Sequence, residues 1–173
     1  MSVTDEVMAA NQEYARTFQL GHLPMPPARK LAIVACMDAR LTVEQALGLK
    51  TGEAHIIRNA GGIVTEDALR SLVISHHLLG TQEFIVINHT DCGMLTFKDE
   101  ELRSKLLAQT GTATVAPGQF HAFSDVEENV RQQVQKIQTH PWVPKQISVR
   151  GFVYDVKTGR LKEIAGRRAA AGD

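Results

Sequence analysis

The chain has few cysteines, no excess of either charge and no long apolar run. Its 19 basic and 19 acidic residues cancel, which argues against a nucleic-acid surface or an anionic membrane as the partner. No stretch approaches the ~20 apolar residues of a membrane span, and the first residues lack the basic and apolar regions of a signal peptide. We therefore expect a cytoplasmic protein that binds neither nucleic acid nor membrane.

Cys36 and Cys92 are the two cysteines of the chain. In a cytoplasmic protein, two cysteines are more often free thiols or metal ligands than a disulfide. They do not form a Cys-x-x-Cys pair, which argues against a thiol redox protein.

A length of 173 residues, 43% of them hydrophobic, predicts a single domain over residues 1–173 with a buried core. Residues 3–18 have the pattern of an amphipathic helix that Ser2 and Asp5 begin with a capping box. A proline-rich connection follows, so residues 1–24 form an arm that packs on its own domain or on a partner subunit. Residues 166–173 have too little apolar content to order themselves, and we expect a disordered tail there.

Short apolar runs that alternate with helical patterns give the fold class. They predict an α/β domain with a mostly parallel central sheet, flanked by helices, and an antiparallel C-terminal edge strand. The expected strands are 31–36, 54–58, 84–88, 147–156 and 161–164, and the expected helices are 43–49, 65–79, 100–107 with Leu102 and Leu106 buried, and one that Ser124 begins.

Thiol and imidazole side chains follow two of these strands. Cys36 ends the first strand, and His89 and Cys92 follow the third. In open parallel sheets, ligands bind beyond the carboxyl ends of the strands. Two thiolates and one imidazole form a catalytic zinc set, which leaves the fourth tetrahedral position open. The spacing alone leaves a competing interpretation, in which buried cysteines only fill space.

Asp38 and Arg40 follow Cys36 at alternating positions, which share one face of an extended chain. Asp38 is therefore either the fourth ligand of a metal or the partner of Arg40 in a charge-assisted pair that leaves the metal to water. A third interpretation is a surface ion pair that contributes ~0–1 kcal/mol.

Taken together, these motifs resemble those of the β-class carbonic anhydrases, in the compact form found in bacteria and archaea. The resemblance covers residues 31–164. It rests on Cys-x-Asp-x-Arg (Cys36, Asp38, Arg40), the turn Asn59-Ala60-Gly61-Gly62 and His-x-x-Cys (His89, Cys92).

The resemblance implies Zn²⁺ bound by Cys36, His89 and Cys92, with an Asp38–Arg40 catalytic dyad beside it. It implies reversible hydration of carbon dioxide to bicarbonate and a proton by attack of zinc-bound hydroxide. It also implies a homodimer or homotetramer, with the N-terminal helix reaching across to the partner.

Three points stay open at this stage. Gly61 and Gly93 either bring backbone N–H groups close to the substrate or only make turns. The substrate is either carbon dioxide or, on the same fold, carbon disulfide or carbonyl sulfide. A catalytically silent protein that binds zinc or an anion is a further alternative, in which Asp38 closes the metal site.

Overall fold

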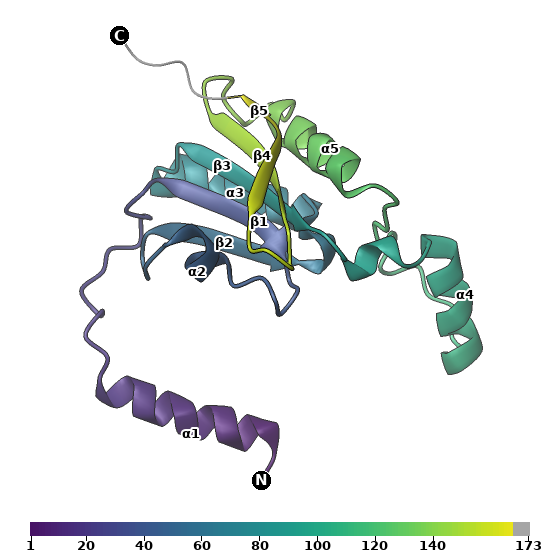
Figure 1. The fold of residues 1–173 in the computed structure, drawn as a ribbon, viewed down its shortest axis with the longest axis horizontal. Helices are drawn as coiled ribbons and strands as arrows, with labels where there is room; N and C mark the ends of the chain where they lie inside the picture. The colour runs from purple at the N-terminus through teal and green to yellow at the C-terminus, as the bar shows by residue number, and fades with distance from the viewer. Residues whose placement is uncertain (168–173) are drawn as a thin grey trace.

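The computed structural model describes residues 1–167. These residues form a five-stranded sheet of order β2-β1-β3-β4-β5, in which only the β4–β5 pair is antiparallel (Figure 1). The predicted α/β class and the antiparallel edge strand are both confirmed.

The elements follow the predicted alternation of strands and helices. The strands are β1 (Leu31–Cys36), β2 (Ala54–Asn59), β3 (Glu83–His89), β4 (Ser148–Tyr154) and β5 (Leu161–Arg167). The α-helices are α1 (Val3–Arg16), α2 (Val43–Leu47), α3 (Glu66–Leu79), α4 (Asp99–Thr110) and α5 (Val126–Gln138), and short 3₁₀ turns occupy Ala60–Gly62 and Gly93–Leu95.

The chain reverses its direction of travel across the sheet at β1. It passes from β1 to its neighbour β2 and then to β3 on the other side of β1. Helix α2 contributes to an apolar cluster with one face of the sheet, whereas α3 and α5 pack in a cluster on the other. The crevice beyond the carboxyl ends of β1 and β3 is therefore the expected ligand site of an open α/β sheet.

Local capping explains where the helices begin and end. Thr65 caps α3 by accepting a hydrogen bond from the Ala68 N–H, and Gly80 ends the helix with a left-handed φ of 73°, which glycine adopts without a Cβ clash. The prediction that Ser124 begins the next helix is wrong, because Asp125 caps α5 through the N–H groups of Glu127 and Glu128.

The C-terminal strand is longer than predicted. β5 includes Gly166 and Arg167, which pair with Arg150 and Val149 of β4, so the prediction of disorder is wrong for these two residues. The backbone pairing of an antiparallel ladder orders them despite their low apolar content. The rest of the predicted tail, 168–173, lies outside the described residues.

Helices α1 and α4 project from the body at two different places (Figure 1). Neither helix has a buried residue. Burial of Leu106 was predicted wrongly, since its side chain is 37% exposed and α4 extends away from the rest of the chain; Leu102 is half-buried. Within residues 1–167, no helix is both long and apolar enough to cross a membrane.

Candidate metal centre

The topology brings three candidate ligands to one point. Cys36 is the last residue of β1 and His89 the last of β3, and these strands are parallel neighbours. Cys92 follows His89 by one short turn. The ligand atoms of the three residues all lie within 4.8 Å of one another, and all three side chains are buried.

The geometry of this cluster fits a zinc ion. The two Sγ atoms are 4.0 Å apart, close to the roughly 3.8 Å expected of two sulfurs at ~2.3 Å from one tetrahedral ion. His89 Nδ1 lies 2.8 Å from the Thr90 carbonyl, which only accepts, so Nδ1 carries the proton. Nε2 then keeps its lone pair. This buried atom has no hydrogen-bond partner among the described residues.

Proton sharing couples the two cysteines. The Cys92 thiol donates toward Cys36, which lowers the pKa of Cys36 and raises that of Cys92. Backbone N–H groups of Asp38 and Gly61 further lower the pKa of Cys36. Burial lowers the pKa of His89, but the Cys36 sulfur and the Thr90 carbonyl outweigh it and raise the pKa overall. The site thus favours a thiolate, the form that binds metals.

Asp38 faces this cluster and is held by Arg40. Its Oδ2 lies 3.6 Å from His89 Nε2. Arg40 donates from its backbone N and Nε to Oδ1, at 2.9 and 3.0 Å, and from Nη2 to Oδ2, at 2.8 Å. The Arg40 side chain and then its backbone N–H hold the pKa of Asp38 well below its usual range, and Asp38 in turn raises the pKa of Arg40.

Two residues of the site have no distinctive pattern in the sequence. Asp91 accepts a hydrogen bond from Arg40 Nη1 at 2.8 Å, and its carbonyl accepts one from Nη2. Arg40 lowers the pKa of Asp91. Arg58 donates to the carbonyls of Cys36 and Asp38, at 3.1 and 2.7 Å. It stands beside Ala35 in the parallel register, and this juxtaposition depends on strand pairing that the sequence does not show.

The two glycines singled out in the sequence, Gly61 and Gly93, have different surroundings in the structure. Gly61 is buried with φ of 81°, and a Cβ there would meet Met94 and Phe123. Gly93 begins the 3₁₀ turn after Cys92 and is exposed; within the described chain, nothing lies within 4 Å of a Cβ added to it. Gly61 is thus the glycine that close packing requires.

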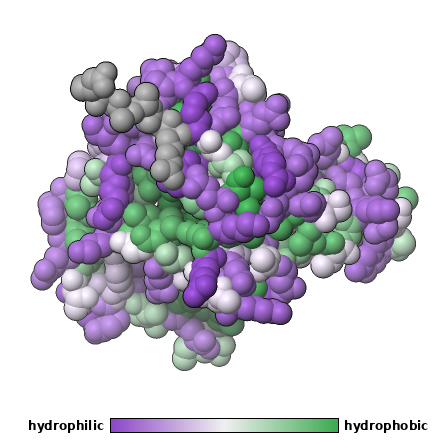
Figure 2. All heavy atoms as spheres, turned by 45° about the horizontal axis from the view of Figure 1, so that its top comes forward, coloured by the Kyte–Doolittle hydropathy of each residue, from purple (hydrophilic) through white to green (hydrophobic). Residues whose placement is uncertain are grey.

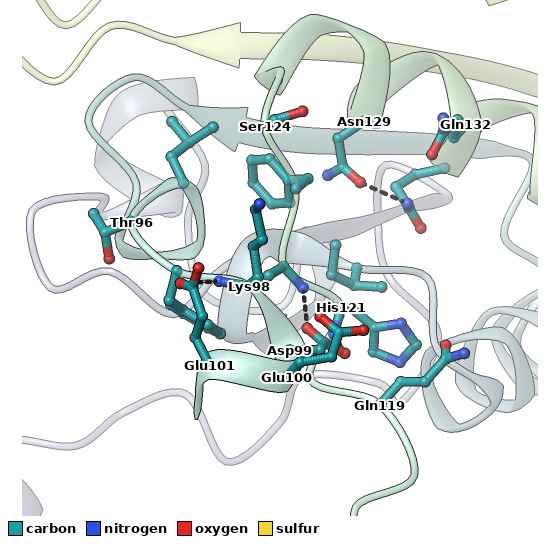
Figure 3. Close-up of a pocket in the computed structure, with 16 residues that line it drawn as sticks. Thr96, Lys98, Asp99, Glu100, Glu101, Gln119, His121, Ser124, Asn129 and Gln132 are labelled. Atoms are coloured by element: carbon teal, nitrogen blue, oxygen red, sulfur yellow. Dashed lines mark hydrogen bonds between the residues drawn. The ribbon is translucent and has the colours of Figure 1, made fainter. Parts of the chain in front are cut away.

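A cavity of about 710 Å³ lies between α4, the 119–124 loop and α5 (Figure 3). Phe97 and Phe123 line it, but most of its lining residues are polar or charged, among them Lys98, His121 and Asn129. The Asp99 carboxylate holds the loop that lines the cavity, because it accepts hydrogen bonds from the backbone N–H groups at 120–122. None of the three candidate ligands lines this cavity.

The family model for carbonic anhydrase matches residues 31–161. The chain belongs to the β-carbonic anhydrase family. The three candidate ligands and the Asp38–Arg40 pair all lie within the matched region.

Individual relatives are similar to this protein over nearly the whole chain. "Beta-carbonic anhydrase 1" of Mycobacterium tuberculosis (strain H37Rv) is 52% identical over 165 residues, which are 95% of this chain and 99% of the relative. A crystal structure of carbonic anhydrase from Streptococcus mutans superposes with a TM-score of 0.89 at 45% identity and covers 95% of this chain and 99% of that one. A carbon disulfide hydrolase of Acidithiobacillus thiooxidans is 33% identical over 94% of this chain and 90% of its own length.

Proposed function

We propose that this protein is a zinc-dependent carbonic anhydrase, which interconverts carbon dioxide with bicarbonate and a proton. The observation that carries the proposal is the buried Nε2 of His89, which has no hydrogen-bond partner among the described residues, beside two thiol sulfurs 4.0 Å apart. A buried nitrogen without a partner is costly, and a metal ion would satisfy it. Family membership supplies the reaction.

Each site residue has a distinct proposed role. Cys36, His89 and Cys92 would hold the zinc ion, which, when bound, lowers the pKa of a water molecule and so supplies a nucleophile near neutral pH. Asp38 would accept a hydrogen bond from the attacking oxygen and aim its lone pair at carbon dioxide. Arg40 would hold Asp38 in that position.

The position of Asp38 supports an open metal site over a closed one. Both carboxylate oxygens already accept hydrogen bonds from Arg40. Direct ligation of zinc would have to compete with these charge-assisted bonds. A catalytically silent protein with Asp38 on the metal would have no use for the pair.

The charge of the ligands predicts how activity depends on pH. Two thiolates cancel the charge of Zn²⁺, whereas three neutral histidines leave it intact, so water should be acidified less here. We expect turnover to rise from neutral to alkaline pH more than in a three-histidine anhydrase. Stopped-flow hydration of carbon dioxide, with zinc content measured on the same preparation, tests both points. One zinc per chain without turnover at any pH would reject the proposed activity.

Carbon disulfide is the second candidate substrate. Relatives named carbon disulfide hydrolase match at 33–37% identity, below the 52% of the β-carbonic anhydrases. The same nucleophile would attack the carbon atom of carbon dioxide or of carbon disulfide, so access to the site determines which of the two is the substrate. Assays with carbon disulfide and carbonyl sulfide, run beside the hydration assay, would show whether sulfur substrates turn over faster.

We further propose a homodimer or homotetramer in which α1 packs on a partner subunit. Apolar side chains of α1 and of the residues just after it are largely uncovered: Val7 in the helix is 57% exposed, and Phe18, two residues beyond its end, is 46% exposed. Helix α1 also projects from the body (Figure 1). Figure 2 shows further apolar atoms gathered on one face of the body, among polar ones. Val7→Asp with Phe18→Asp should lower the mass in analytical ultracentrifugation, whereas the polar-position control Gln12→Asp should not; equal masses would contradict the proposal.

A cytoplasmic location remains part of the proposal. The two thiols lie 4.0 Å apart, where oxidation would remove two metal ligands, and a reducing compartment protects them. Cell fractionation with an antibody to the protein would test this.

A further inference from the structure

A chain of buried side-chain amides runs from α5 to the end of β3. Gln133 Nε2 donates to Asn129 Oδ1 at 2.9 Å, and Asn129 Nδ2 donates to Asn88 Oδ1 at 2.7 Å. The backbone N–H of Val64 donates to Gln133 Oε1 at 2.8 Å. All three amide side chains are buried, with Asn129 5% exposed. Figure 3 shows Asn129 in the wall of the cavity, with its hydrogen bond to the next amide of the chain.

The two ends of the amide chain fix its direction. The Val64 N–H only donates, so Gln133 must offer its oxygen there. At the other end, Asn88 Nδ2 donates to the carbonyls of Gly61 and Gly62, at 2.8 and 3.2 Å, which only accept. Each amide between the ends therefore has one permitted orientation, and reversing any of them sets two acceptors or two donors against each other.

The chain of amides ends at the Gly61–Gly62 turn, which lies close against the backbone of Cys36. Gly62 has φ of 62°, and a Cβ there would lie 2.9 Å from the backbone N of Cys36 and 2.8 Å from Asn88 Nδ2. Asn88 itself directly precedes His89 on β3. The chain of amides thus contacts the turn that lies against Cys36, and it includes the residue that precedes His89.

We propose that Asn88, Asn129 and Gln133 are positioning residues for the metal site, which fix the Gly61–Gly62 turn against Cys36 and thereby slow the loss of the metal. The proposal rests on the proposed zinc function. It assigns to α5, which contributes no metal ligand, a part in holding the ion. Apolar packing attaches α5 to the sheet independently, through Val130 and Val134 against Gly151, so the buried amides are not needed for that attachment.

Asn129→Asp tests the proposal in the full-length zinc protein. A carboxylate cannot donate, so it sets an acceptor against Asn88 Oδ1. If Asn88 turns to compensate, its oxygen meets the Gly61 and Gly62 carbonyls. Partners beyond the ligands typically change metal affinity 10- to 100-fold. We therefore expect zinc to transfer to a chromogenic chelator at least about tenfold faster than from the wild type, and the thiolate-to-metal charge-transfer band of the cobalt(II)-substituted protein to shift.

Val130→Ala is the matched control. It neighbours Asn129 on α5, is fully buried and removes apolar contacts without touching the amide chain. It should lower the melting temperature but leave the zinc transfer rate within about twofold of wild type and the cobalt band unmoved. If Asn129→Asp fails to fold, Gln133→Glu, which removes only the donor to Asn129, takes its place.

The outcomes separate this inference from the function on which it rests. Wild-type zinc and cobalt behaviour in the Asn129 or Gln133 variant overturns the positioning role, as does equally rapid zinc loss from Val130→Ala. A wild-type protein that binds zinc but does not hydrate carbon dioxide overturns the proposed activity and leaves the zinc-transfer comparison valid. A wild-type protein that binds no zinc overturns both.

Discussion

Arg40 holds Asp38 on both carboxylate oxygens, through Nε to Oδ1 and Nη2 to Oδ2. The same guanidinium reaches Asp91 across the site, at 2.8 Å from Nη1. Since Asp38 Oδ2 lies 3.6 Å from His89 Nε2, the fork fixes a carboxylate beside the position that a metal would occupy. A lysine could not make both bonds, because its ammonium is a single point of donation.

Replacing Arg40 by alanine should separate metal binding from turnover. The three ligands are untouched, so zinc should stay near one per chain. Asp38 would keep the bond from the backbone N–H but lose both guanidinium bonds, and we expect turnover to fall about 10- to 100-fold. Stopped-flow hydration and metal analysis on one preparation measure the two quantities.

Arg70→Ala is the control for Arg40→Ala. Arg70 forms an exposed ion pair with Asp67 on α3, and surface pairs of this kind contribute little. Its loss should leave zinc and turnover near wild type. A near-normal rate in Arg40→Ala would reject the dyad.

Cys92→Ser should abolish zinc binding without unfolding the chain. A serine hydroxyl is a poor zinc ligand, and two remaining ligands do not retain the ion. We expect zinc content to fall below about a tenth of wild type, with the far-ultraviolet circular dichroism unchanged. Met94→Leu, a substitution of similar volume in the same apolar cluster, should keep its zinc. Full occupancy in Cys92→Ser would remove Cys92 from the ligand set.

Periodic features of the sequence predicted most of the fold. Apolar runs located β1 and β3, and Thr65 and Gly80 located the ends of α3, because each of these patterns acts through neighbours along the chain. The start of α5 was harder, since Ser124 and Asp125 are both good capping residues and the choice depends on the local backbone. The end of β5 was missed because pairing with β4, rather than composition, orders it.

The site was predictable where residue type alone suggests a role. Thiols and an imidazole at the ends of predicted parallel strands suggested a metal, and the fold brings Cys36, His89 and Cys92 together. Arg58 and Asn129 gave no such indication. An arginine or asparagine is common on any surface, and only strand register and helix packing bring these two to the site.

Asp99 should make stability depend on pH in the acid range. The backbone N–H groups of Ala122, Phe120 and His121 lower the pKa of its carboxyl in the folded chain. A depressed folded pKa contributes stability above the unfolded value of about 3.9 and loses it as pH falls through the folded pKa. Asp99→Asn should therefore destabilise by about 1 kcal/mol at pH 7, with the difference shrinking below about pH 4. Thermal unfolding of both proteins from pH 3 to 7 measures this, and a difference as large at pH 3 as at pH 7 would contradict it.

Gly62 should tolerate no side chain. A Cβ would lie 2.8 Å from Asn88 Nδ2 and 2.9 Å from the Cys36 backbone N, in a left-handed conformation of φ 62°. Backbone strain and steric conflict together should cost about 3 kcal/mol or more in Gly62→Ala. Gly80 has a similar φ of 73°, but a Cβ there has no described atom within 4 Å, so Gly80→Ala isolates the strain at about 1–2 kcal/mol. Urea unfolding of the two variants compares them directly. Equal losses would mean that the close approach of the turn to Cys36 contributes nothing, whereas a larger loss at Gly62 would measure the steric cost of that close approach.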